Sequence, residues 1–90
     1  MDKLVAMRSE IDVIDKQLIS FLGQRFQITE RIGLYKADNA LPASDENREL
    51  GQFFEYRKLA LQHDISEELV ADIFKRVIEE VILRHKQLIN

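Results

Sequence analysis

The stretch LVAMRSEIDVIDKQLISFLGQRFQITERIGLYK, residues 4–36, decides the fold of this 90-residue chain. Apolar residues recur in it every seven positions, in two interleaved series. The first series contains Leu4, Ile11, Leu18 and Ile32, and the second contains Met7, Ile14, Phe21, Ile28 and Tyr35. This heptad pattern predicts one long helix, from residue 3 to about residue 38, whose apolar seam packs against other helices.

Arg25 occupies the position of the first series where the pattern requires an apolar residue. A guanidinium group keeps its proton in proteins, so its burial is costly unless an anion lies beside it. A glutamate on another helix would satisfy it as a buried ion pair, and a ligand with negative charges would satisfy it equally well. The pattern alone leaves both interpretations open.

The only proline, Pro42, divides the chain, and the loop-like residues 38–44 surround it. Ser44 is predicted to be the N-cap of a second helix, which has acidic residues in its first turn. This helix is expected to end near residues 62–64 and to bury four apolar side chains: Leu50, Phe53, Phe54 and Leu61.

Ser66 is predicted to open a third helix. This helix carries an apolar series at spacings of three, four or seven positions: Phe74, Ile78, Val81 and Leu88. The sequence has no strand pattern and no repeat, so the predicted fold class is all-α, with three helices in a single domain that spans residues 1–90.

The length of the first helix predicts a homodimer. A helix of about 35 residues is roughly 50 Å long, whereas a compact domain of this size has a radius of gyration near ~12 Å. One end of the helix would therefore leave its apolar seam in water, and a second copy of the chain would cover it in an intertwined helical homodimer. A break at Gly23, which would give a monomer of four helices, is the alternative.

Composition excludes several classes of protein. The chain has no cysteine, which rules out disulfides and thiol catalysis, and its two histidines lie in unrelated contexts, so no metal site is expected. A net charge of −3 argues against nucleic acid as a partner. The sequence also has no basic and apolar leader and no apolar run of about 18 residues, so we expect no membrane partner and a cytoplasmic location.

Further cations lie on the predicted faces of the first helix. Lys36 lies about 20° from Arg25 around the helix axis, three turns away, so the two side chains share one wall. Arg8 points about 100° away from Arg25 and is better placed to reach across an interface. Taken singly, such residues are usually solvated or paired surface charges.

Polar residues on the other two helices point toward the same interior. Asp45, Arg48 and Glu49 cluster within the first turn of the second helix, and His85 interrupts the apolar series of the third. A histidine on an apolar face is usually a hydrogen-bonded core residue, and charges in a first turn are usually solvated. Together with the three cations of the first helix, however, they favour a ligand that carries more than one negative group.

These residues, in this order and spacing, resemble the all-α class (type II) of chorismate mutases. The similarity covers essentially the whole chain and rests on Met7-Arg8-Ser9-Glu10-Ile11-Asp12, Ile14-Asp15, Leu18-Ile19, Leu22, Arg25, Ile32-Gly33, Lys36, Pro42, Asp45 and Arg48-Glu49. The resemblance implies an intertwined homodimer of three-helix chains with shared active sites. It also implies the Claisen rearrangement of chorismate to prephenate in aromatic amino acid biosynthesis, with no cofactor and no metal.

The resemblance assigns roles in binding chorismate, a dianion with two carboxylates, an ether bridge and a ring hydroxyl. Arg25 is expected to clamp one carboxylate, and the partner's Arg8 the other. Glu49 is expected to accept a hydrogen bond from the ring hydroxyl, and two neighbours shape that side of the site: Asp45 and Arg48.

The ether oxygen gathers negative charge as its C–O bond breaks, so donors aimed at it are expected to accelerate the reaction. The resemblance gives this role to Lys36 and to His85, which stands where many family members have glutamine. Val81 stands where serine is common, which removes a polar contact to the substrate. If protonated His85 is the better donor, turnover should rise as the pH falls through about 6.5, where histidine ordinarily titrates.

Two other functions remain open from the sequence. A relative on the same scaffold, such as an isochorismate pyruvate-lyase or an aminodeoxychorismate mutase, would use a similar cationic site. A non-catalytic helical dimerisation module would instead keep the fold without turnover.

Overall fold

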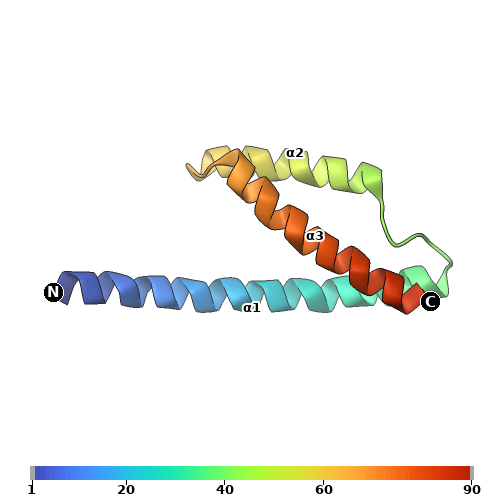
Figure 1. The fold of residues 1–90 in the computed structure, drawn as a ribbon, viewed down its shortest axis with the longest axis horizontal. Helices are drawn as coiled ribbons and strands as arrows, with labels where there is room; N and C mark the ends of the chain where they lie inside the picture. The colour runs from blue at the N-terminus through green and yellow to red at the C-terminus, as the bar shows by residue number, and fades with distance from the viewer. Residues whose placement is uncertain (1, 90) are drawn as a thin grey trace.

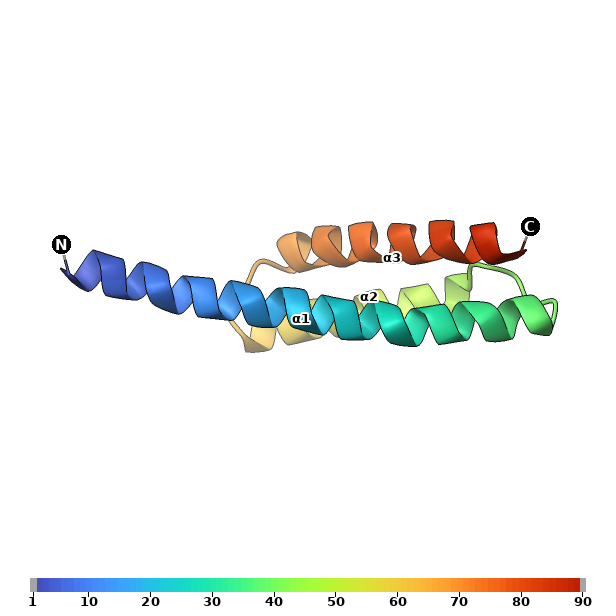
Figure 2. The same cartoon turned by 90° about the horizontal axis from the view of Figure 1, so that it is seen from below.

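The computed structural model describes residues 2–89 and, within them, contains three helices (Figure 1), which confirms the predicted all-α class. Their bounds are α1, Asp2–Asp38; α2, Glu46–Gln62; and α3, Glu67–Ile89. α3 packs against both α1 and α2. Within the described residues, the backbones of α1 and α2 do not contact each other. The N-terminal part of α1 projects beyond the other two helices in both views (Figures 1 and 2).

α1 runs unbroken for 37 residues, so the alternative of a helix break at Gly23 is wrong. Gly23 is exposed, and a Cβ atom built on it would meet nothing within 4 Å. Gly33 differs, because it is buried where α3 crosses α1. Gly23 is therefore an ordinary helical residue, whereas Gly33 permits α3 to pack closely on α1.

A side chain caps the N-terminus of α2 and that of α3. The prediction of Ser44 as the N-cap of α2 is wrong by one residue, because the Asp45 carboxylate accepts the hydrogen bond from the backbone N–H of Arg48 at 3.1 Å. Ser66 does cap α3 as predicted, since its hydroxyl accepts a hydrogen bond from the backbone N–H of Leu69 at 3.2 Å. α2 ends at Gln62, also as predicted.

The core of the single chain is small. Its buried apolar side chains are Ala60, Ala71 and Ile78. The prediction that α2 buries four large apolar residues is wrong for the chain alone, since Leu50 and Phe54 are each 71% exposed, Leu61 is also exposed, and only Phe53 is partly buried. Among the described residues the backbone of α2 contacts that of α3 and not that of α1, so Leu50, Phe54 and Leu61 stay exposed in the single chain.

The apolar seam of α1 is also largely uncovered. Its N-terminal members are all exposed: Leu4, Met7, Ile11, Ile14, Leu18 and Phe21. The molecule measures 57 × 23 × 14 Å and its radius of gyration is 16.6 Å, well above the ~12 Å of a compact chain of this length. The predicted extended shape is therefore confirmed. None of the described helices combines the length and apolarity needed to cross a membrane.

Candidate active site

A cavity of about 420 Å³ lies between α1, the start of α2 and α3. Seven of the eight site residues predicted from the sequence line it: Arg25, Lys36, Asp45, Arg48, Glu49, Val81 and His85. The eighth, Arg8, is exposed near the N-terminal end of α1 and does not line the cavity of its own chain. The three helices thus bring together residues that are up to 60 positions apart in the sequence.

Arg25 extends from α1 to the cavity, and contacts with Tyr56 and Phe74 hold one end of its guanidinium group. Its Nη2 donates a hydrogen bond to the Tyr56 hydroxyl at 3.4 Å, and its Cζ lies 5.9 Å from the centre of the Phe74 ring. Its Nη1 is buried and has no hydrogen-bond partner within the described chain. No carboxylate of residues 2–89 forms an ion pair with Arg25, so the described part of the chain does not neutralise this cation.

Lys36 brings a second positive charge to the same wall, as the helical geometry predicts. Its Nζ donates to the backbone carbonyl of Ala43 at 3.1 Å, which ties the α1–α2 connection to the cavity. An ammonium group has three N–H donors. Two of them therefore stay available to a ligand.

The first turn of α2 forms another part of the cavity wall. Besides capping the helix, Asp45 donates its own backbone N–H to Oε2 of Glu49 at 3.2 Å. This reciprocal arrangement is a variant of the capping box and fixes the Glu49 carboxylate. The second carboxylate oxygen of Glu49 has no hydrogen bond within the described chain and can accept one from a ligand hydroxyl.

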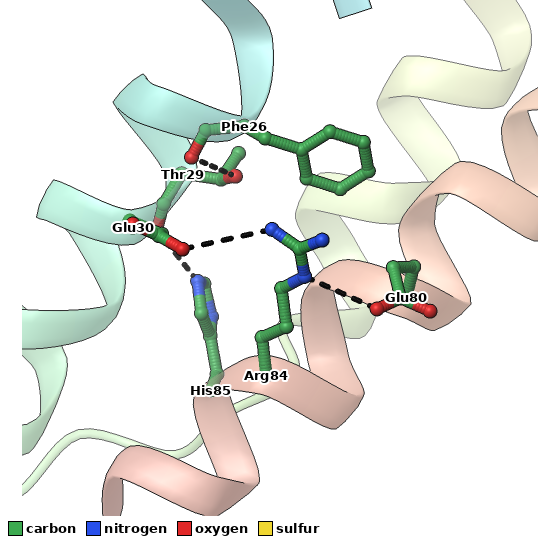
Figure 3. Close-up of polar contacts among 6 residues, drawn as sticks. All are labelled: Phe26, Thr29, Glu30, Glu80, Arg84 and His85. Atoms are coloured by element: carbon green, nitrogen blue, oxygen red, sulfur yellow. Dashed lines mark hydrogen bonds and ion pairs between the residues drawn. The ribbon is translucent and has the colours of Figure 1, made fainter. Parts of the chain in front are cut away.

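His85 is 3% exposed and lies between α3 and α1 (Figure 3), where it lines the cavity. Its Nε2 lies 2.7 Å from the backbone carbonyl oxygen of Thr29. A carbonyl oxygen only accepts hydrogen bonds, so Nε2 carries the proton and donates. The other ring nitrogen, Nδ1, is buried without a partner among the described residues. In the neutral ring, Nδ1 therefore presents a lone pair, and it becomes a donor only when a second proton binds.

An ion-pair cluster beside His85 holds α3 on α1. Arg84 pairs with Glu30 of α1 at 3.6 Å and with Glu80 at 3.1 Å, and its guanidinium lies 4.4 Å from the centre of the Phe26 ring (Figure 3). These contacts are partly exposed and each contributes little free energy alone. Their main effect is on position, because they hold the turn of α3 that carries His85 against α1.

Three of the residues at the site that the sequence did not predict are polar: Thr29, Gln52 and Tyr56. Thr29 acts through a backbone carbonyl, which leaves no trace in the sequence. Gln52 and Tyr56 lie one and two turns after Glu49 on α2, so continuing the face of Glu49 along that helix would have pointed to them.

The geometry defines a class of protein, a small helical protein whose cavity holds two cations, Arg25 and Lys36, that form no ion pair within the described residues. The family model described as chorismate mutase type II matches residues 7–86. The chain therefore belongs to the type II chorismate mutase family, as the resemblance of its motifs indicated.

Curated relatives agree with this assignment. The chain is 27% identical to the chorismate mutase of Methanocaldococcus jannaschii over its whole length and 91% of that protein. It is 30% identical, over 97% of its length, to the T-protein of Haemophilus influenzae and to the bifunctional chorismate mutase/prephenate dehydratase of Buchnera aphidicola subsp. Schizaphis graminum. The chain spans 23% of the length of each of these last two proteins.

Proposed function

We propose that this chain catalyses the rearrangement of chorismate to prephenate, the step that family members contribute to aromatic amino acid biosynthesis. The observation that carries the proposal is Arg25, whose buried Nη1 has no partner in a cavity that also holds Lys36. The cavity lining has three cations and two carboxylates, and neither Arg25 nor Lys36 forms an ion pair with a carboxylate of the described residues. These two cations are therefore available to a ligand that carries carboxylates.

The reaction is unimolecular, so the protein needs no nucleophile and no cofactor. Its contribution is to hold the reactive conformer and to stabilise the charge that develops on the ether oxygen. Arg25 binds one carboxylate through Nη1, and Lys36 directs one of its free N–H groups to the ether oxygen. Glu49 accepts a hydrogen bond from the ring hydroxyl, with Asp45 and Arg48 supporting it.

His85 supplies the second donor to the ether oxygen, and only in its protonated form. The bond from Nε2 to Thr29 leaves Nδ1 as the free ring nitrogen. A neutral ring would present its lone pair to the ether oxygen and repel the developing charge, whereas an imidazolium would donate to it.

Two copies of the chain form the working enzyme. The exposed seam on the projecting part of α1 and the exposed apolar side chains of α2 support pairing, because an uncovered apolar stripe of this length is rare in a monomer. Within this chain, Arg25 is assigned to one carboxylate, Lys36 to the ether oxygen and Arg48 to the support of Glu49, which leaves the second carboxylate without an assigned cation. The partner's Arg8 fills that role.

The test is the loss of chorismate on adding purified protein, with the product identified. Prephenate supports the proposal, pyruvate release would assign the chain to the lyases of this scaffold, and unchanged chorismate would favour a non-catalytic module. Arg25→Ala is expected to lower kcat/KM at least ~100-fold with the melting temperature kept, since a charged hydrogen-bonding partner of the substrate is lost. Arg76→Ala is the matched control, because Arg76 is largely exposed and outside the cavity.

A further inference from the structure

Tyr56 is held rigidly behind the cavity wall, although it does not line the cavity. Its ring stacks on Phe74 of α3 with centroids 4.0 Å apart and planes 18° apart. Phe53 contacts the same ring edge-on at 5.7 Å. These two contacts fix the ring plane and therefore the position of the phenol oxygen.

The phenol oxygen accepts two hydrogen bonds. One comes from Nη2 of Arg25 on α1 at 3.4 Å, and the other comes from Nε2 of Gln52 on α2 at 3.2 Å. The backbones of α1 and α2 stay apart, so the bond from Arg25 to Tyr56 spans the gap between these helices. The oxygen thus holds one terminal nitrogen of the guanidinium and leaves the other, Nη1, without a partner.

We propose that Tyr56 is a positioning residue that holds Arg25 ready to bind a substrate carboxylate. An arginine side chain has many rotamers, and ordering it when the ligand arrives would weaken binding. Tyr56 fixes the guanidinium before the ligand binds, and Gln52 fixes the hydroxyl that does so. This inference rests on the proposed function and adds to it a residue outside the cavity.

The test is Tyr56→Phe, which keeps the stacked ring and removes only the hydroxyl. Arg25 binds the carboxylate in both the ground state and the transition state, so KM is expected to rise about fivefold with kcat changed less than about twofold. The control is Tyr35→Phe, because the Tyr35 ring is exposed and its hydroxyl has no hydrogen bond within the described chain. A Tyr56→Phe protein with the KM of the Tyr35→Phe protein would overturn the inference.

A double-mutant cycle separates positioning from general support of the fold. In an Arg25→Lys protein the guanidinium is gone, so adding Tyr56→Phe should change kcat/KM by less than about twofold. If the two losses multiply, Tyr56 acts independently of Arg25 and the inference is wrong. If the wild-type protein leaves chorismate unchanged, both the proposed function and this inference are wrong. If the wild type is active and Tyr56→Phe leaves KM unchanged, only the inference is wrong.

Discussion

His85 of α3 rests so closely on Gly33 of α1 that a Cβ atom at position 33 would lie 2.6 Å from the ring carbon Cδ2. It would also lie 3.0 Å from Nε2, the nitrogen that donates to Thr29. Gly33 and the hydrogen bond from His85 to Thr29 therefore together set the position of the imidazole ring. Gly33 lets the ring approach the helix, and the Thr29 carbonyl fixes its rotation and its protonation pattern.

Gly33→Ala should displace the imidazole. A contact this close forces the ring or the helix to move, so we expect unfolding free energy to fall by about 1–3 kcal/mol and turnover to fall with it. Chemical denaturation and the rate of chorismate loss measure the two effects. Gly23→Ala is the control on the same helix, and it should raise stability by about 0.5–1 kcal/mol without loss of turnover. Equal behaviour of the two variants would contradict the role of Gly33.

The hydrogen bond from Nε2 to Thr29 predicts the direction of the pH dependence. Only the imidazolium can donate from Nδ1, so in the proposed mechanism His85 acts in its protonated form. If His85 acts this way, turnover should rise toward low pH. The measurement is kcat as a function of pH.

His85→Gln is the diagnostic variant for that profile. A glutamine amide donates at every pH, so the variant should keep activity and lose the rise toward low pH. A variant whose profile matches that of the wild type would show that another group titrates. The melting temperature should be followed in parallel, because acid unfolding would mimic a change in turnover.

Val81 leaves the cavity with an apolar wall where a hydroxyl would contact the substrate. Val81→Ser should lower KM by about three- to tenfold, the size of one additional hydrogen bond. It should also lower stability by about 1 kcal/mol, because apolar surface is lost. Val77→Ser is the matched control, since Val77 is a partly buried residue of α3 outside the cavity and should lose stability without a change in KM.

The sequence was most informative where the signal is local. The seven-residue period predicted α1 because the positions of side chains around a helix depend only on their spacing. The same geometry placed Arg25 and Lys36 on one wall, and the cavity contains both. The cap of α2 was predicted one residue early, because Ser44 and Asp45 are both good caps and only the backbone path decides between them.

Contacts between elements were harder to predict. The burial expected for Phe54 and its neighbours on α2 does not occur in one chain, since an apolar pattern does not say whether its cover is the same chain or another copy. Nor did the pattern show that His85 would use Nε2 on a carbonyl of α1. That contact depends on how α3 crosses α1, which brings positions 56 residues apart together.

Mixing two inactive variants tests whether the active site is shared between chains. In the proposed dimer each site takes Arg25 from one chain and the partner's Arg8 from the other, so Arg8→Ala and Arg25→Ala homodimers should both be nearly inactive. A heterodimer of the two variants has one site with both defects and one intact site. Equal amounts, unfolded and refolded together, should therefore regain about a quarter of wild-type activity, since about half of the dimers are mixed and half of their sites are intact.

Each variant refolded alone is the control and should stay inactive. A mixture that stays as inactive as its parts, although sedimentation shows dimers, would mean that Arg8 serves its own chain or none.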